Sequence, residues 1–160
     1  MSEKFTYGII AKTKQWFEEA LATPTKQNQQ VQVGCHLEEV LEMLDSIDIQ
    51  THQYQLTAAK QALEVLSNIL KKDTSVVLTI RDRKEFLDAV ADQLVTATGC
   101  GHVFGMDVVG ALNEVNESNW SKFENGKAVF NEHGKIKKGV NYREPVLAPY
   151  LGKDPTDLLH

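Results

Sequence analysis

The sequence predicts an all-α protein: an antiparallel bundle of about five helices, followed by a short C-terminal hairpin and an extended arm. Two observations predict this fold. Apolar residues recur at helical spacing through most of residues 1–122, as they do in helices that bury one face. After Lys122 the chain changes to short stretches rich in turn-forming residues. We expect residues 1–122 and 123–160 to form one domain, because 160 residues is the length of a single domain.

Apolar spacing places the first four helices, and a capping residue places the fifth. The first helix ends before Pro24, because the residue that precedes a proline disfavours the helical conformation. Asp107 is a candidate N-cap for the fifth helix. The predicted helices are Glu3–Ala22, Gln29–Ile47, Gln53–Lys72, about Phe86–Gly105 and Val108–Lys122.

Two segments lack a clear helical pattern. Residues 75–80, SVVLTI, are β-branched enough for a strand, yet they lead into a helix. We therefore expect a helix to begin within residues 73–86, and a break near Arg81 stays open. The stretches KAVF (127–130) and KIKKG (135–139) flank a His-Gly turn signal, so we expect them to pair as a small hairpin.

Composition excludes several classes of protein. The net charge of −5 argues against binding of a nucleic-acid polymer, which usually needs a basic surface. No apolar run reaches the roughly 18 residues that span a bilayer. The start, MSEKFTYG, lacks the apolar core of a signal peptide. Cys35 and Cys100 do not form a CxxC motif, so we expect a reduced, cytoplasmic protein with two small buried thiols.

Two pairs of acidic residues stand out at helical spacing. The helix over residues 86–105 is so apolar that we expect it to be buried on most of its circumference. Asp88 and Asp92 interrupt it four residues apart, about 40° from each other around the helix. Glu39 and Glu42 form a second pair, three residues apart on another helix. Buried like charges need compensation, and two such pairs that face each other suit a hard cation.

Mg²⁺ is the metal that these four carboxylates predict, with Mn²⁺ as a second choice. Mg²⁺ prefers carboxylate ligands, keeps several waters and is often completed by substrate phosphates. Such an ion neutralises a polyphosphate and activates a bound water for attack on phosphorus. The alternative for the glutamates is an ordinary solvated helix face, and for the aspartates a structural role.

The end of the fifth predicted helix, NEVNESNWSKF, carries candidate substrate-binding residues. Asn116, Asn119 and Lys122 step by three residues along it. Lys122 supplies a point charge suited to a phosphate, and the two amides suit a ribose, a phosphate or a base edge. In the C-terminal turn, Lys135, Lys137 and Lys138 are further candidates that could face an anion in an adjoining subunit. The alternatives are an ordinary polar helix end and a solvated turn.

Three motifs, taken in their order along the chain, resemble those of a known family. The Glu38-Glu39-x-x-Glu42 motif resembles the EExxE of MazG-type nucleoside triphosphate pyrophosphohydrolases. DAVADQLVTATG followed by NEVNESNWSKF is similar to their second acidic helix and the helix after it. The tail GKAVFNEHGKIKKGVNYREPVLAPYL is similar to the ending of phage and bacterial phosphoribosyl-ATP pyrophosphohydrolase-like members. The resemblance covers roughly Gln32–Leu151, and the order of these motifs is more specific than EExxE alone.

The resemblance implies the all-α NTP pyrophosphatase fold, assembled as a homodimer or homotetramer, with Mg²⁺ held by carboxylates of two helices. It implies that Glu39 and Glu42 are metal ligands and that Asp92 is the aspartate of the family's ExxD motif. The position three residues before Asp92 is Ala89 rather than glutamate, and Asp88 on the same face stands in for it. Asn119 and Lys122 match the substrate-facing SN and K.

The sequence therefore predicts a Mg²⁺-dependent enzyme that cleaves a nucleoside triphosphate between its α and β phosphates, giving a monophosphate and pyrophosphate. Glu38 or Glu39 would orient or deprotonate the attacking water. A second hypothesis, motivated by Ala89, is a catalytically silent helical module that binds nucleotides or partners. A third is a phosphoribosyl-ATP pyrophosphohydrolase, which differs in its substrate rather than in its chemistry.

Overall fold

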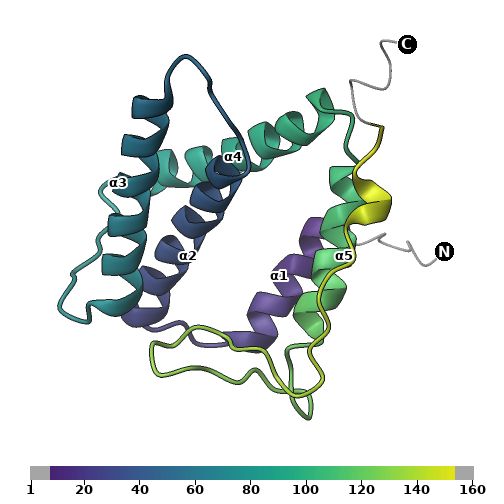
Figure 1. Ribbon diagram of the computed structural model, residues 1–160. Coiled ribbons are helices and arrows are strands. Elements are labelled where there is room, and N and C mark those ends of the chain that lie inside the picture. Colours follow the sequence, from purple (N-terminus) through teal and green to yellow (C-terminus); the bar gives the residue numbers. More distant parts are fainter. Residues whose placement is uncertain (1–7, 154–160) are drawn as a thin grey trace. The chain divides into compact units, whose positions relative to one another are not determined.

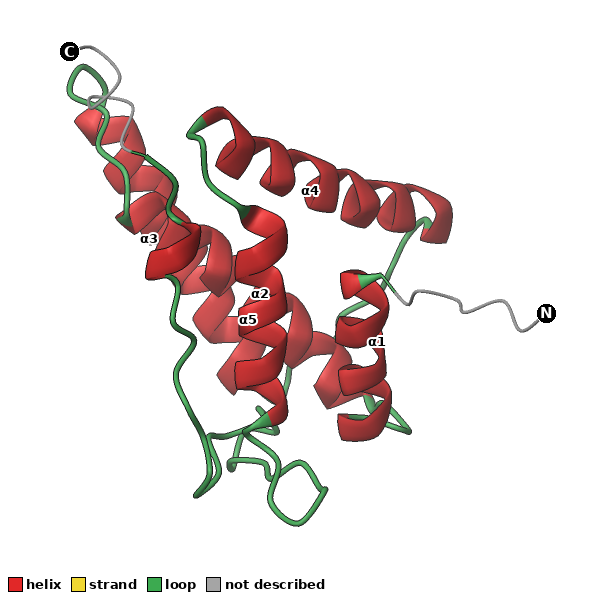
Figure 2. Cartoon of the chain, turned by 90° about the vertical axis from the view of Figure 1, so that its right-hand side faces the viewer, coloured by secondary structure: helices red, strands yellow, loops and turns green. Residues whose placement is uncertain are grey.

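The computed structural model describes residues 8–153, and over that range the protein is all-helical (Figures 1 and 2). The all-α class predicted from the sequence is confirmed. The described residues contain isolated antiparallel bridges but no extended strand. Their helices are α1 (Ile9–Ala20), α2 (Lys26–Asp45), α3 (Gln53–Lys72), α4 (Arg83–Val103), α5 (Val108–Trp120) and the single 3-10 turn η1 (Ala148–Tyr150).

The chain forms two compact units, and neither is a simple half of the sequence. One unit contains α1, α4, α5 and η1, and draws on residues 8–22, 80–129 and 137–153. The other contains α2 and α3 within Thr23–Thr79, together with the short segment Phe130–Ile136. We call them the α1–α5 unit and the α2–α3 unit and describe them in turn.

In the α2–α3 unit, the two long helices pack against each other along one seam. Gly34 lies in this seam: a Cβ built on it would be 2.8 Å from Lys71 Cγ and 3.0 Å from the Ser67 carbonyl oxygen. The buried Ser67 hydroxyl donates to the Gly34 carbonyl at 2.9 Å. At one end of the seam the Gln30 amide donates to the Asp73 carbonyl at 2.6 Å. The absence of a side chain at residue 34 thus lets the two backbones approach closely.

The start of α2 is fixed by a reciprocal cap. The Thr25 hydroxyl accepts from the Asn28 backbone N–H, and the Asn28 side chain accepts from the Thr25 backbone N–H. Each bond satisfies a backbone or side-chain group that the first helical turn would otherwise leave unpaired. The helix therefore begins at Lys26, three residues earlier than the sequence pattern predicted.

In the α1–α5 unit, α1 lies against α5 through a buried polar seam (Figure 1). Asn116 is only 1% exposed. Its side-chain oxygen accepts from the Thr13 hydroxyl at 2.9 Å, and its amide nitrogen donates to the Ile9 carbonyl at 3.3 Å. The buried Trp16 indole donates to the Asn119 carbonyl at 2.9 Å. Both ends of the Asn116 amide are thus used to join α1 to α5.

The helix α4 begins where the sequence left a break open. Asp82 caps it by accepting from the backbone N–H groups of Lys84 and Glu85, so residues 76–80 form neither helix nor strand. The prediction that this helix is buried is wrong for the single chain. Leu87 and Val95 are 68% and 70% exposed, and Cys100, predicted to be a buried thiol, is also exposed.

The exposure of α4 follows from what lies beside it. Among the described elements of its own unit it contacts only α5. The contact is made near its last turn, where a Cβ on Gly101 would collide with the Val108 side chain. The apolar composition of α4 correctly indicates that this helix needs cover, but it does not say which element provides the cover.

The C-terminal part of the chain is fastened to α5 by polar contacts. Arg143 lies 2.6 Å from the Glu114 carboxylate, which also accepts from the Val146 N–H at 3.0 Å. The buried Ser118 hydroxyl donates to the Arg143 carbonyl at 2.8 Å. Near η1, the Asp107 N–H donates to the Tyr150 carbonyl at 2.9 Å. The extended arm predicted from the sequence is therefore held along α5.

Several smaller predictions can be compared with the described residues. The predicted hairpin exists only as local pairing: Phe130 bridges Ile136, and the Lys137 N–H donates to the Val129 carbonyl at 2.8 Å. The first predicted helix starts at Ile9, and its expected residues 3–7 lie outside the described range. In the part of the chain that the structure describes, no single helix is long and apolar enough to cross a membrane, although α4 and α5 together, bent by 118°, meet that length and composition.

Candidate functional site

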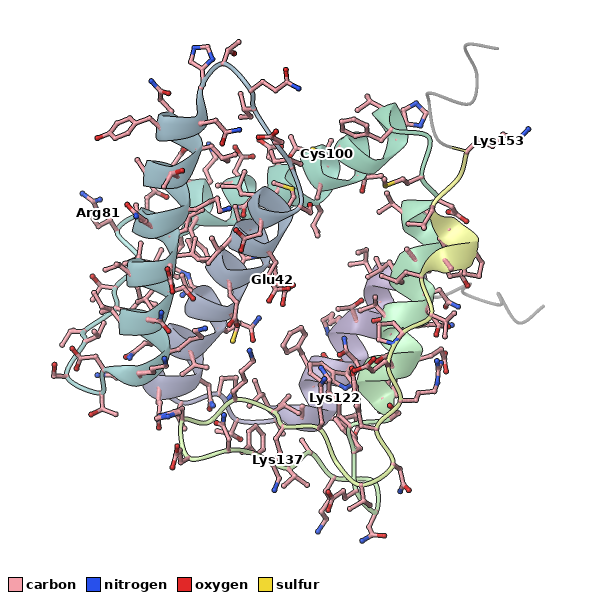
Figure 3. All side chains as sticks on the ribbon, in the orientation of Figure 1. Glu42, Arg81, Cys100, Lys122, Lys137 and Lys153 are labelled. Atoms are coloured by element: carbon pink, nitrogen blue, oxygen red, sulfur yellow. The ribbon has the colours of Figure 1, made fainter. Side chains whose placement is uncertain are left out.

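The three glutamates of α2 face different surroundings because of their angular positions. Successive residues of an α-helix turn by about 100°, so Glu38 lies roughly 40° from Gly34 in the seam. Glu42 and Glu39 lie roughly 80° and 140° from Gly34. Glu38 is accordingly half-buried beside α3, whereas Glu39 and Glu42 are exposed (Figure 3 labels Glu42). Glu39 and Glu42, the two predicted metal ligands on this helix, therefore share the outer surface of α2.

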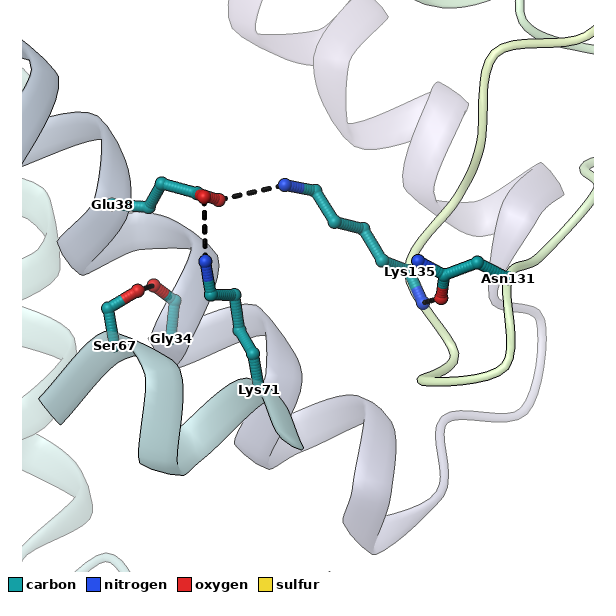
Figure 4. A network of polar contacts seen from close by, with 6 residues as sticks. All are labelled: Gly34, Glu38, Ser67, Lys71, Asn131 and Lys135. Carbon is teal, nitrogen blue, oxygen red and sulfur yellow. Dashed lines mark hydrogen bonds and ion pairs between the residues drawn. The ribbon is translucent and has the colours of Figure 1, made fainter. Parts of the chain in front are cut away.

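Glu38 is held between two lysines. Its Oε1 lies 2.6 Å from the ammonium of Lys71, on the last turn of α3. Its Oε2 lies 2.8 Å from the ammonium of Lys135, which comes from the short segment 130–136 (Figure 4). The side chains of Lys71, Glu38 and Lys135 are 14%, 26% and 46% exposed, so the network runs from the helix seam to the surface.

The electrostatics of this network favour the charged forms. Burial alone would raise the pKa of the Glu38 carboxyl, but the hydrogen bonds and charges of Lys135 and Lys71 outweigh it, and that pKa is lowered. Burial likewise opposes the charge of Lys135, yet the hydrogen bond to Glu38 and the attraction of neighbouring anions raise the pKa of its ammonium. Nearby, burial is the main cause of the raised pKa of the Cys35 thiol.

The segment that carries Lys135 is a turn held by its own hydrogen bonds. The Asn131 side-chain oxygen accepts from the backbone N–H groups of His133 and Lys135 at 3.0 and 2.9 Å. The Asn131 N–H donates to the Lys135 carbonyl at 2.9 Å, and Gly134 adopts a φ of +75°. A positive φ favours glycine, because other residues place a Cβ against the following backbone there. The backbone of Lys135 is therefore held by hydrogen bonds within the turn, independently of the contact between its side chain and Glu38.

The predicted aspartate pair lies on α4, in the other unit. Asp88 and Asp92 are both exposed, as are most residues of that helix. Within each unit, the described residues include no cluster of three or more His, Cys, Asp or Glu side chains that would hold a metal ion. The convergence of Asp88 and Asp92 with Glu39 and Glu42 stays a prediction of the sequence.

The predicted substrate-binding residues all belong to the α1–α5 unit, where they make contacts of their own. Asn116 is buried in the seam between α1 and α5, as described above. The Asn119 side chain accepts from the Lys122 ammonium at 2.7 Å, and that ammonium lies 5.9 Å from the centre of the Trp16 ring. Lys138 lies 4.5 Å from the centre of the Tyr142 ring and 3.8 Å from Glu144. Asn119 and Lys122 are thus brought together, whereas Asn116 is buried and hydrogen-bonded to α1.

Sequence reasoning missed Lys71 and Lys135 as partners of Glu38. Lys71 lies in the last turn of a helix, where the helix dipole alone is a sufficient reason for a cation. Lys135 belongs to a basic turn that would usually be solvated. The signal that existed was three glutamates within five residues of one helix, because a nearby positive charge relieves the repulsion among them.

Comparisons of the chain with protein-family models, with curated proteins and with solved structures found no match.

Proposed function

We propose that this protein is a Mg²⁺-dependent nucleoside triphosphate pyrophosphohydrolase. The observation that carries the proposal is the different surroundings of the three glutamates of α2. Glu38 is compensated by two lysines, while Glu39 and Glu42 present a pair of carboxylates at i, i+3 spacing on the exposed surface of the same helix. In this proposal Glu38 is a positioning residue, and Glu39 takes the role of orienting the attacking water.

The donor set suits a hard divalent cation. Carboxylate oxygens are the protein ligands that Mg²⁺ prefers, and Mn²⁺ accepts the same oxygens. Glu39 and Glu42 would hold the ion, with Asp88 and Asp92 as the further ligands that the sequence predicts. When bound, the cation would supply charge neutralisation for the polyphosphate and a more acidic water. The chain's own contribution would be to hold the nucleotide, with Asn119 and Lys122 as its contacts and Lys138 as a further candidate.

The same proposal includes the arrangement and surroundings of the protein. The described helices would complete an antiparallel bundle, and the exposed apolar residues of α4 would be covered in a homodimer or homotetramer. The substrate would be a free nucleotide, in the cytoplasm, rather than a nucleic-acid polymer. Water would add to a phosphorus while the α–β anhydride bond breaks, which releases a nucleoside monophosphate and pyrophosphate.

A panel of the common dNTPs and NTPs, incubated with the full chain and Mg²⁺, tests the proposal. The products should be a nucleoside monophosphate and pyrophosphate, separated by ion-exchange chromatography, and chelation by EDTA should stop the reaction. Release of inorganic phosphate and a diphosphate would contradict cleavage between the α and β phosphates. Including phosphoribosyl-ATP in the panel distinguishes the enzyme of histidine synthesis from a general nucleotide hydrolase.

A second candidate function follows from Ala89, the position where the resemblance implies a glutamate. A chain with one ligand fewer would bind nucleotides through the same scaffold without turning them over. Isothermal titration separates the two candidates: nucleotide binding that does not depend on Mg²⁺, with no product in the panel, favours the silent module.

A further inference from the structure

We propose that Lys71 and Lys135 form a subsite for a phosphate group, and that Glu38 holds the two ammonium groups side by side. This inference rests on the proposed function, because it assigns the subsite to the phosphates of the polyphosphate substrate and of its pyrophosphate product. All three residues belong to the α2–α3 unit, and Figure 4 shows the Glu38 carboxylate with one ammonium at each oxygen.

The first argument is the geometry of the two cations. Both ammonium groups hydrogen-bond to one carboxylate, at 2.6 and 2.8 Å. The two oxygens of a carboxylate belong to one small planar group, so the ammonium groups are held within a few ångströms of each other. A lysine ammonium has three N–H donors, and the bond to Glu38 uses one of them. Each lysine therefore keeps donors for the oxygens of a second anion.

The second argument is the stoichiometry. A simple structural ion pair in the same unit joins one lysine to one carboxylate, as Lys60 does with Asp45 at 2.5 Å. At Glu38 two lysines share one carboxylate, so these three side chains together carry one net positive charge in a partly desolvated place. A phosphate group, with several oxygens and more than one negative charge, complements this arrangement better than a second carboxylate does.

The third argument is preorganisation. Lys71 extends from the last turn of α3 and its side chain is only 14% exposed. Lys135 extends from the turn that Asn131 and Gly134 fix. Because a helix and a hydrogen-bonded turn hold the two backbones and Glu38 orients both side chains, little conformational entropy remains to be lost when an anion binds. The 46% exposure of Lys135 leaves an approach from solvent.

Neighbouring carboxylates oppose an incoming anion, and the experiment must allow for that. The charge of Glu39 reaches Lys135, and Glu42 lies on the same helix one turn further along. Binding of pyrophosphate is therefore measured by isothermal titration of the full chain with excess Mg²⁺ present. The variants are Lys135→Met, Lys135→Arg and, as the matched control, Lys60→Met, which removes one lysine from an ion pair elsewhere on the same two helices.

We expect Lys135→Met to weaken the binding of magnesium pyrophosphate by about tenfold or more, the typical effect of losing a charged hydrogen bond. Lys135→Arg should keep the affinity within about threefold, because a guanidinium also donates to phosphate oxygens. Lys60→Met should bind as the unchanged chain does. Circular dichroism confirms that each variant is folded.

Two results would overturn the subsite: no measurable binding of magnesium pyrophosphate by the unchanged chain, or equal losses of affinity in Lys135→Met and Lys60→Met. The proposed function fails separately. If the nucleotide panel gives no product but Lys135→Met still weakens the binding of magnesium pyrophosphate, the subsite is supported and the enzyme activity is not. If nucleotides are hydrolysed while Lys135→Met binds pyrophosphate normally, the enzyme stands without the subsite.

Discussion

The hydroxyl of Ser67 donates a 2.9 Å hydrogen bond to the carbonyl of Gly34, which brings the backbones of α2 and α3 together at a position without a side chain. A Cβ on residue 34 would lie 2.8 Å from Lys71 Cγ and 3.0 Å from the Ser67 carbonyl oxygen. We expect Gly34→Ala to lower the free energy of unfolding by about 1–2 kcal/mol, because overpacking exceeds the gain of about 1 kcal/mol in helix propensity.

Urea denaturation measures this change, and Gly99→Ala is the matched control. Apart from its chain neighbours and the nearby backbone of α4, no heavy atom of the described residues lies within 4 Å of the position that a Cβ on Gly99 would take, and Gly99 is also inside a helix. That variant should gain up to about 1 kcal/mol of stability, since alanine is the better helix former. An equal gain in Gly34→Ala would show that α2 and α3 do not approach as closely as described.

The pair between Glu38 and Lys135 should make stability depend on pH in a defined direction. The pKa of Glu38 is lowered from the ordinary value of 4.5, so the stabilisation is fully present above that value and is lost as the pH falls through the lower, folded-state pKa. A double-mutant cycle of Glu38→Gln and Lys135→Gln should give a coupling free energy of about 1 kcal/mol at neutral pH. The coupling should be lost as the pH is lowered through the folded-state pKa, because the carboxyl is then protonated in both states. A coupling that is unchanged in acid would mean that the charge of Glu38 does not contribute to it.

The buried amide of Asn116 should matter for stability. Asn116→Ala removes both of its hydrogen bonds and leaves a cavity between α1 and α5, so we expect a loss of about 2–3 kcal/mol in the free energy of unfolding. Asn113→Ala is the control, because that side chain joins the same two helices only through an exposed bond to Lys12. Its loss should stay within about 0.5 kcal/mol. Chemical denaturation followed by tryptophan fluorescence compares the two, and similar losses would contradict the buried role of Asn116.

The predicted metal ligands should control turnover. Glu42→Gln and Asp92→Asn each replace a charged ligand by a neutral amide of the same shape, and we expect each to lower kcat/KM for nucleotide hydrolysis by about a hundredfold or more. Raising the Mg²⁺ concentration should recover part of the loss in these variants. Glu64→Gln, an exposed carboxylate on α3, should leave turnover unchanged. Full activity in both ligand variants would remove these residues from the mechanism.

The sequence was sufficient for features that depend on local periodicity. It predicted α3 at Gln53–Lys72 and the start of α5 at Val108, because a clear apolar stripe and a capping aspartate define them. It missed three residues at the start of α2, since Thr25 and Asn28 form a cap in a stretch whose polarity is typical of a loop. Local patterns predict the helices, and polar capping residues fix where α2, α4 and α5 begin.

Tertiary partners lie outside the reach of such patterns. Glu38 and Lys135 are 97 residues apart, and no periodicity connects a glutamate on a helix with a lysine in a turn. The apolar composition of α4 led to a prediction of burial that fails for Leu87 and Val95, because composition states a need for contact without naming its source. The predicted metal site depends on such tertiary contacts. Glu39 and Glu42 lie on α2, whereas Asp88 and Asp92 lie on α4, which belongs to the other unit.

The α2–α3 unit is discontinuous, and this has a consequence for how the chain is made. The continuous part of the unit, which contains α2 and α3, ends at Thr79. The segment Phe130–Ile136, which completes the unit, comes about fifty residues later. During synthesis on a ribosome, α2 and α3 emerge well before Lys135 can reach Glu38. While α4 and α5 are translated, Glu38 therefore lacks its contact with Lys135, and a fragment that stops before residue 130 would lack the same contact.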